Sequence, residues 1–378
     1  MKKIPANDRP VLFHLITAFG IGGAERLLER LLPRLSDYQH VIISLKGDGP
    51  IRKDFERAGL HTEVLNMRYP FSLSSFALFR RLVKRYKPQV LTTCLVHADL
   101  IGRVWAKCSG IPHVACYLVA RYRDKRFWLV VRLMALTDWL VNDYIAVSTE
   151  VQRYFVEDVH LPKRKFTVIP NSVDPLVFQP NHNIHNRTKI LRELDLPEDC
   201  NVVGTVSNLR QEKCIERLVA ALPFVFQKDD KAHCIIVGDG VRREALEQQA
   251  RALGISDRIR FVRFWPILTD IFPVLDIYVL PSAFEGMSIA LLEAMSTGCG
   301  IVVTDTPENQ EVIVKGTGLL VDTANSNILG DAILRLLINS DERQSLGKAA
   351  RERVKKNFSL SQSVSELTDF YRKIIAES

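Results

Sequence analysis

The sequence lacks any segment of about 18 consecutive uncharged apolar residues, the length that a membrane-spanning helix needs. Its seven cysteines include no C-x-x-C pair and form an odd number, so we expect buried cytosolic thiols and neither a zinc site nor a disulfide framework. Two lysines and a short apolar run open the chain, but Asp8, Arg9 and Pro10 interrupt the pattern of a secretory signal, and a first strand explains the apolar run better. These absences predict a cytoplasmic protein.

The composition of the 378 residues, with 25% charged and 47% hydrophobic, is that of a soluble globular protein with room for two α/β domains. The charge is uneven: residues 1–180 hold 27 Lys and Arg against 16 Asp and Glu, net +11, and the remaining 24 against 27 give −3. Nucleic acid, an anionic membrane surface or an acidic acceptor would each explain a basic first half. The arginines match no nucleic-acid-binding motif, so we expect no nucleic acid partner.

Short apolar runs alternate with helical patterns along both halves of the chain, as in "HVIISL" and "DIYVLPS". This alternation predicts doubly wound parallel sheets. The polar stretch "FQPNHNIHNRTK" is rich in Pro and Asn and predicts a crossing between domains. We therefore expect domains at residues 1–182 and 183–360, followed by a final helix within 361–378 that can pack on either domain.

Glycines follow predicted strands at two places. Gly20, Gly22 and Gly23 precede a helix, where they would let the backbone approach a phosphate at the helix N-terminus. A tight turn is the alternative, with Glu25 favouring the helix dipole without any ligand. In "IIVGDGVRREAL", Gly238 follows a strand, but Arg243 replaces the third glycine of a dinucleotide motif, which makes a nicotinamide site a weak interpretation.

A cationic pair follows a third strand, in "VSNLRQEKCIERL". The guanidinium of Arg210 and the ammonium of Lys213, three residues apart, could bind two oxygens of a diphosphate. The alternative is a solvated helix start.

Two acids bracket the apolar run Met287 to Leu292 in "PSAFEGMSIALLEAMSTG". A helix that begins near Met287 would direct amides toward phosphate or sugar oxygens above the preceding strand. Ionised carboxylates only accept hydrogen bonds, so Glu285 suits a sugar and Glu293 a ribose. The amides in question belong to four residues: Gly286, Met287, Ser288 and Ile289.

The segment 117–140 combines cations with aromatic residues. Arg121, Arg123, Lys125 and Arg126 lie beside Tyr, Phe and Trp side chains, which is typical of a segment on an anionic membrane. A core helix with a solvated basic flank is the alternative.

These motifs occur in the order found in retaining GT-B glycosyltransferases of family 4, which the chain resembles over nearly its whole length. The shared motifs are "GGAE" from Gly22, "VIPNSVD", "NLRQEK", "IIVGDG" and the E-x7-E of Glu285 and Glu293. The resemblance implies two Rossmann-like domains facing a central cleft, with a nucleoside-diphosphate sugar bound mainly by the C-terminal domain and an acceptor bound mainly by the N-terminal one. It also implies retention of anomeric configuration without a metal or other cofactor, and the chain has no D-x-D.

The resemblance implies catalytic roles for Glu285, Arg210 and Lys213, and donor binding by Gly22, Gly23, Gly238, Glu293 and the residues from Gly286 to Ile289. Two positions depart from the family pattern: Asn208 stands where an arginine is usual, with Arg210 as the substitute, and Leu118 stands at a usual histidine. On the acceptor side His97 or Arg121 would replace that histidine, unless His97 is a partly buried polar group without a role in binding.

The resulting hypothesis is a metal-independent hexosyltransferase that moves a sugar, from a UDP-sugar in preference to a GDP-sugar, to a lipid-linked or cell-envelope saccharide. We expect it in the cytoplasm, peripheral on an anionic membrane surface. The alternatives are a nucleotide-sugar epimerase on the same fold and a non-catalytic sugar-nucleotide-binding protein.

Overall fold

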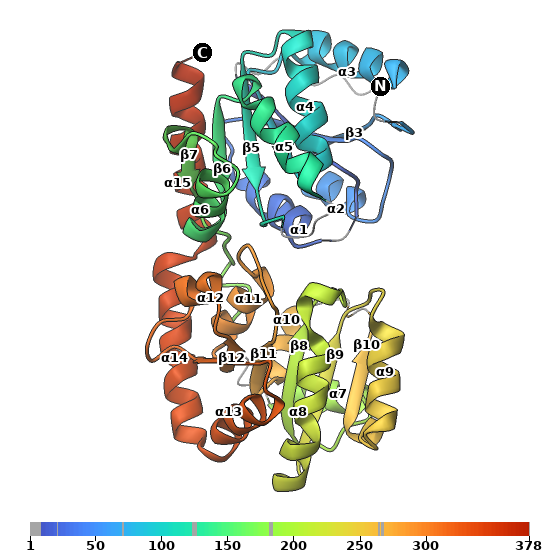
Figure 1. The fold of residues 1–378 in the computed structure, drawn as a ribbon, viewed down its shortest axis with the longest axis vertical. Coiled ribbons are helices and arrows are strands. Elements are labelled where there is room, and N and C mark those ends of the chain that lie inside the picture. The colour runs from blue at the N-terminus through green and yellow to red at the C-terminus, as the bar shows by residue number, and fades with distance from the viewer. Residues whose placement is uncertain are drawn as a thin grey trace. The chain divides into compact units, whose positions relative to one another are not determined.

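The computed structural model of the chain describes residues 9–20, 22–69, 72–122, 127–180, 184–263, 265 and 268–377. The chain forms two compact α/β units, shown in Figure 1. Unit 1 comprises Met1–Asn171 and Ser361–Ser378, and unit 2 comprises Ser172–Leu360.

Unit 1 contains a parallel sheet of seven strands in the order β3-β2-β1-β4-β5-β6-β7 (Figure 1). Its strands are nearly continuous apolar runs because helices bury both faces of a parallel sheet. The strands are β1 (Val11–Ile16), β2 (Gln39–Ser44), β3 (His61–Val64), β4 (Val90–Cys94), β5 (His113–Leu118), β6 (Asp143–Ala146) and β7 (Phe166–Val168). The helices are α1 (Gly23–Leu31), α2 (Arg52–Arg57), α3 (Leu73–Tyr86), α4 (Val96–Ser109), α5 (Trp128–Leu136), α6 (Thr149–Glu157) and α15 (Leu360–Ala376).

Two neighbouring threonines of β4 show which helices cover the sheet of unit 1. Successive side chains of a strand point to opposite faces. The Thr92 Oγ1 atom lies 3.1 Å from the hydroxyl of Tyr371 on α15, whereas Thr93 donates a 3.3 Å hydrogen bond to Asp99 on α4. The last helix of the chain and α4 therefore cover opposite faces of this sheet.

Unit 2 contains a parallel sheet of six strands in the order β10-β9-β8-β11-β12-β13. The two sheets confirm the predicted pair of doubly wound Rossmann-like folds. The strands are β8 (Asn201–Val206), β9 (Ala232–Val237), β10 (Ile259–Val262), β11 (Ile277–Leu280), β12 (Gly300–Thr304) and β13 (Leu319–Val321). The helices are α7 (Ile184–Glu193), α8 (Ile215–Lys228), α9 (Arg243–Ala252), α10 (Leu268–Ile271), α11 (Ile289–Thr297), α12 (Pro307–Val312), α13 (Ser326–Ile338) and α14 (Ser340–Asn357).

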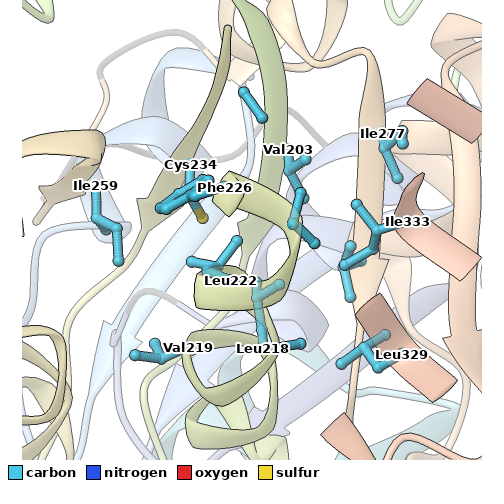
Figure 2. Close-up of a cluster of buried hydrophobic side chains, with 14 of the residues drawn as sticks. Val203, Leu218, Val219, Leu222, Phe226, Cys234, Ile259, Ile277, Leu329 and Ile333 are labelled. Atoms are coloured by element: carbon cyan, nitrogen blue, oxygen red, sulfur yellow. The ribbon is translucent and has the colours of Figure 1, made fainter. Parts of the chain in front are cut away.

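The core of unit 2 forms where α8 packs on the sheet, as Figure 2 shows. Leu218, Leu222 and Phe226 recur every four residues along α8, so they share the face that turns inward. They pack with Val203 of β8 and with Ile333 of α13. This packing fixes the start of α8 and the loop that precedes it.

The cysteines and the helices can be compared with two further predictions from the sequence. All seven cysteines are free and six are buried, but Cys108 is exposed, so the expectation of buried thiols is wrong for this residue. The reason is its position on α4, one helical turn after the exposed Val104 and thus on the outer face. No helix within the described residues is long and apolar enough to cross a bilayer.

Candidate functional site

The strand order of each sheet reverses once, between β1 and β4 in unit 1 and between β8 and β11 in unit 2. In doubly wound folds ligands bind at such a reversal, outside the carboxyl ends of the two strands. In unit 2 the loop after β8 carries Arg210 and leads into a 3-10 turn, Gln211–Lys213, and the loop after β11 carries Glu285. A 3.0 Å hydrogen bond from the Ala283 amide to the Glu212 carbonyl joins these two loops.

Lys213 and Glu285 meet at this reversal point. The Lys213 Nζ atom lies 2.6 and 2.7 Å from the two carboxylate oxygens of Glu285. The side chains are 21% and 9% exposed, respectively, so the ion pair is largely removed from water. The Ser282 hydroxyl donates a further 2.8 Å hydrogen bond to Glu285 Oε1. The structure thus brings together two of the three predicted catalytic residues.

Sequence reasoning missed Ser282, although it precedes Glu285 by only three residues in "PSAFE". Its hydroxyl and the Lys213 ammonium fix the rotamer of the Glu285 carboxylate. The pair can serve two chemical purposes: the carboxylate can accept hydrogen bonds from sugar hydroxyls, and the ammonium can neutralise a diphosphate oxygen.

The helix after Glu285 begins at Ile289, two residues later than the predicted start at Met287. Ser288 is the N-cap, and its side chain accepts a 3.3 Å hydrogen bond from the Leu291 amide. An N-cap serine satisfies one of the amides that the first helical turn leaves unpaired, which explains the later start. Gly286 and Met287 therefore lie in the loop, and Ser288 and Ile289 lie at the helix N-terminus.

Glu293 is on α11 and is almost fully buried, with 4% of its surface exposed. Tyr278 of β11 is fully buried, and burial followed by the charges of Glu285 and Glu293 raises the pKa of its phenol well above the usual range. The two acids of the E-x7-E motif therefore act on one buried phenol. Sequence reasoning did not single out Tyr278; the available signal was a tyrosine in an otherwise apolar strand before the acid-bearing loop.

The remaining predicted donor residues of unit 2 lie in the loops beside this pair. The Arg210 and Asn208 side chains are exposed to solvent at the end of β8. Gly238 has a φ of +143°, and a Cβ there would lie 1.8 Å from the Ser207 carbonyl oxygen. The glycine thus lets the loop after β9 lie directly on the loop after β8. A direct contact between Gly238 and a donor stays a prediction.

The glycine loop of unit 1 lies at the other reversal point, after β1. Gly22 is the N-cap of α1 and Gly23 is its first residue. A Cβ on Gly22 would lie 2.4 Å from a carboxylate oxygen of Glu25, so this acid already occupies the space beside the helix N-terminus. The arrangement agrees with the alternative in which Glu25 satisfies the helix dipole without a ligand. Donor binding by Gly22 and Gly23 stays a prediction.

His97 lies in the first turn of α4, beyond the carboxyl end of β4, and is exposed. Partial burial of the ring, and then the charge of Lys46, lower the pKa of His97 below its usual value. Lys46 follows β2, which β1 separates from β4 in the sheet, so Lys46 and His97 lie at the same edge of the sheet.

Arg121 has a different environment. It is buried and forms a 2.8 Å ion pair with Glu150 of α6, which also pairs with Arg153 at 2.7 Å. These groups line a polar cavity of about 420 Å³. The other cations predicted for this segment, Arg123, Lys125 and Arg126, lie outside the described residues.

No cluster of three or more His, Cys, Asp or Glu side chains that could hold a metal ion occurs in the described part of the chain. The cations at the reversal point of unit 2 include Lys213 and Arg210, and Arg217 donates a 3.3 Å hydrogen bond to the carbonyl of Pro281, directly after β11.

Two family models match the chain. The model of Glycosyltransferase Family 4 matches residues 21–175, and the model of Glycosyl transferases group 1 matches residues 186–353. Together they cover both units, and the second contains the pair of Lys213 and Glu285.

Individual glycosyltransferases are also similar to this chain in sequence or in structure. A GDP-mannose-dependent alpha-(1-6)-phosphatidylinositol monomannoside mannosyltransferase of Mycobacterium tuberculosis is 29% identical over 223 residues, 56% of this chain and 57% of its own length. A UDP-Gal:alpha-D-GlcNAc-diphosphoundecaprenol alpha-1,3-galactosyltransferase of Escherichia coli is 23% identical over 316 residues, 79% of each chain. Among solved structures, Anabaena HepE in complex with UDP and glucose matches with a TM-score of 0.87 and 19% identity, covering 97% of this chain and 100% of that chain.

Proposed function

The chain belongs to the group 1 glycosyltransferases and has the GT-B fold, and from this premise we propose that it transfers a sugar from a nucleoside-diphosphate sugar to a saccharide acceptor. The observation that carries the proposal is the pair of Lys213 and Glu285, which two loops bring together at the reversal point of the unit 2 sheet. A cation that could bind a diphosphate thus lies beside a carboxylate that could bind a sugar.

Lys213 and Arg210 would stabilise the negative charge that develops on the departing diphosphate. A preorganised positive group aimed at such charge is usually the largest single contribution to catalysis. Ser282 and Lys213 hold the Glu285 carboxylate, which would bind sugar hydroxyls, and Glu293 would bind the ribose. We propose that the reaction retains the anomeric configuration and needs no metal ion.

The acceptor that we propose is a lipid-linked or cell-envelope saccharide at the cytoplasmic face of a membrane. The name of the Escherichia coli relative includes a diphosphoundecaprenol acceptor, which supports this class. For the donor we propose uridine as the base, in line with the UDP bound to HepE, although the Mycobacterium tuberculosis relative is named for GDP-mannose.

Product analysis with a panel of UDP-, GDP- and ADP-sugars tests the proposal. With an acceptor such as a short lipid-linked saccharide, we expect a glycosylated product in which the transferred sugar keeps the anomeric configuration, α or β, that it has in the donor. A chelator should cause no loss of activity. Conversion of the donor to an epimeric nucleotide sugar without any acceptor would favour the epimerase, and donor binding without turnover would favour the non-catalytic protein.

The variant Glu285→Gln gives the matching test of the site. It should lower turnover far more than affinity for the nucleoside diphosphate, because this acid lies where the sugar and not the base would bind. Glu293→Ala should instead weaken binding of the free nucleoside diphosphate. Near-normal turnover of Glu285→Gln would remove the central claim about the site.

A further inference from the structure

Helix α5 of unit 1 turns apolar side chains toward solvent. Met134 is its one fully buried residue, although the helix reads WLVVRLMAL. Large apolar residues of α5 and of the 3-10 turn that follows it, Asp138–Leu140, are exposed. They are Trp128, Leu129, Leu133, Leu136 and Trp139. We call this set the α5 face.

The exposed residues of α5 form one continuous surface. At about 100° per residue, the helical positions of the α5 face and Arg132 fall within an arc of roughly 140°. Arg132 is the one charged residue on this arc, and its guanidinium lies over the Trp128 ring, 4.4 Å from the ring centroid. A monomeric protein rarely leaves such an apolar surface open unless it contacts a partner or a membrane.

The α5 face is held outward by the structure behind it. Arg103 of α4 is completely buried and donates 3.0 Å hydrogen bonds to the Met134 carbonyl and to the Thr137 hydroxyl. Its guanidinium also pairs with Asp99. Because this anchor fixes the C-terminal end of α5, the apolar side chains cannot turn inward without breaking a buried ion network.

Acidic groups are absent from the α5 face. Residues 127–137 contain no Asp or Glu. The next acid, Asp138, is turned away from solvent, since its carboxylate accepts hydrogen bonds of 2.8 Å from Lys165 and 3.0 Å from Tyr144. A helix face without acids of its own suits anionic lipid head groups, which repel carboxylates.

Cations are exposed on the helices packed behind α5. Helix α4 contacts both α5 and α3, and it exposes Val104 and Lys107. Helix α3 exposes four basic residues, Arg80, Arg81, Lys84 and Arg85, and its C-cap Lys87 is exposed as well. Together with the net charge of +11 over residues 1–180, these helices give unit 1 a cationic surface close to an apolar one.

We propose that the α5 face docks unit 1 on a bilayer that contains anionic lipid. The leucines insert among the upper acyl chains, and Trp128 and Trp139 lie at the level of the head groups, where the amphipathic indole ring is favoured. The cations of α3 attract the anionic head groups, and this part of the attraction is screened by salt. The biological purpose of this docking rests on the proposed function, because docking would bring the enzyme to a lipid-linked acceptor. The docking itself is tested by lipid binding, which is measured without any sugar transfer.

Vesicle co-sedimentation of the full chain tests this surface. Wild-type protein should pellet with vesicles of phosphatidylcholine mixed with phosphatidylglycerol, and only weakly with phosphatidylcholine alone. High salt should release most of it and leave a fraction held by the α5 face. The variant Leu129→Gln/Leu136→Gln should bind about ten- to a hundredfold more weakly and lose the salt-resistant fraction, because two leucines that would insert into the bilayer are lost without a change of charge.

The matched control is Leu176→Gln/Ile338→Gln in unit 2, since Ile338 is 74% exposed and Leu136 is 72% exposed. It should bind vesicles like the wild type. Brominated lipid should quench the wild-type tryptophan fluorescence strongly. Trp128→Phe/Trp139→Phe should lose that quenching, because of the two remaining tryptophans Trp105 is buried and Trp265 belongs to unit 2.

Three results would overturn the proposal: no binding of the wild type to anionic vesicles, equal loss of binding in the control, or unchanged binding of the α5 variant. A wild-type dimer in sedimentation velocity that the α5 variant abolishes, with no vesicle binding, would instead assign the face to a contact between two copies. Transfer to a soluble acceptor analogue should persist in the α5 variant. If the wild type binds vesicles but no donor supports transfer, the proposed function fails and the docking surface stands.

Discussion

Replacing Lys213 by methionine tests how much of the unit 2 site depends on its ion pair. The substitution keeps the length of the side chain and removes the ammonium that contacts both oxygens of Glu285. The carboxylate then keeps the Ser282 hydroxyl but loses its cation. We expect a less stable protein even without any substrate.

The magnitude follows from the geometry. At an effective dielectric constant of about 20, unit charges about 3 Å apart attract by roughly 5–6 kcal/mol. The cost of removing both groups from water offsets much of this attraction. Losing a charge-assisted hydrogen bond typically costs about 1.5–3 kcal/mol, so we expect Lys213→Met to lower the free energy of unfolding by about 2 kcal/mol. For a domain of about 150–250 residues this corresponds to a fall of roughly 4–8 °C in Tm.

A double-mutant cycle isolates the pair. Glu285→Gln should cost less than Lys213→Met, because Lys213 is partly exposed and can turn to water. The double variant should lose less free energy of unfolding than the two single variants lose in sum, by about 1–2 kcal/mol. Denaturant unfolding of unit 2 measures these losses. Additive losses, within about 0.5 kcal/mol, would show that the two side chains do not stabilise each other and would refute the reasoning.

Three further predictions follow from single contacts. Arg210→Ala should weaken UDP binding in calorimetry by about ten- to a hundredfold, and Asn208→Arg should restore it; a silent Arg210→Ala would exclude Arg210 as the substitute for the family arginine. Gly238→Ala should lower the free energy of unfolding by more than about 2 kcal/mol, because its Cβ would collide with the Ser207 carbonyl. The control Gly254→Ala, at φ +66° with open space around the Cβ, should cost only about 1 kcal/mol. Equal losses in the two variants would contradict this reasoning. His40 is buried against His14, and burial lowers its pKa to about 4, so the unfolded chain takes up a proton below about pH 6.5 that the folded chain does not. Stability should therefore be full above pH 6.5 and fall by roughly 3 kcal/mol toward pH 4 in urea titrations, with a smaller slope in His40→Asn; an unchanged slope would exclude this group.

The architecture could be predicted from the sequence because buried parallel strands appear in it as short continuous apolar runs. "HVIISL" covers β2 except its first residue, Gln39, "DIYVLPS" contains β11, and both sheets are doubly wound as predicted. The start of α11 was misplaced by two residues because an N-cap serine competes with the turn before it, and propensity alone does not decide that competition.

The chemistry of the site was predictable only in part. The sequence offers Lys213 and Glu285 as separate motifs 72 residues apart, and nothing local says that their charged atoms are paired. Tyr278 and Ser282 are ordinary residues for a strand and a turn, so their role beside the acids depends on tertiary packing. The sequence predicts Arg121 at an acceptor or a membrane, which stays a prediction; its ion pair with Glu150 inside unit 1 could not be predicted, because that contact depends on how α6 packs.

The pairing of Lys213 with Glu285 links stability to the proposed reaction. Without donor, the ammonium and the carboxylate satisfy each other's charge, which keeps a carboxylate stable in a site that is largely closed to water. On the proposed function, a diphosphate would compete for the ammonium, and the sugar hydroxyls would then supply the hydrogen bonds that the carboxylate gives up. Donor binding would therefore exchange one ion pair for two sets of substrate contacts at little cost in unpaired charge. A substrate that brought only the diphosphate would leave Glu285 without its cation, so the wild type should bind the complete nucleoside-diphosphate sugar more tightly than the nucleoside diphosphate alone, and Glu285→Gln should reduce that difference.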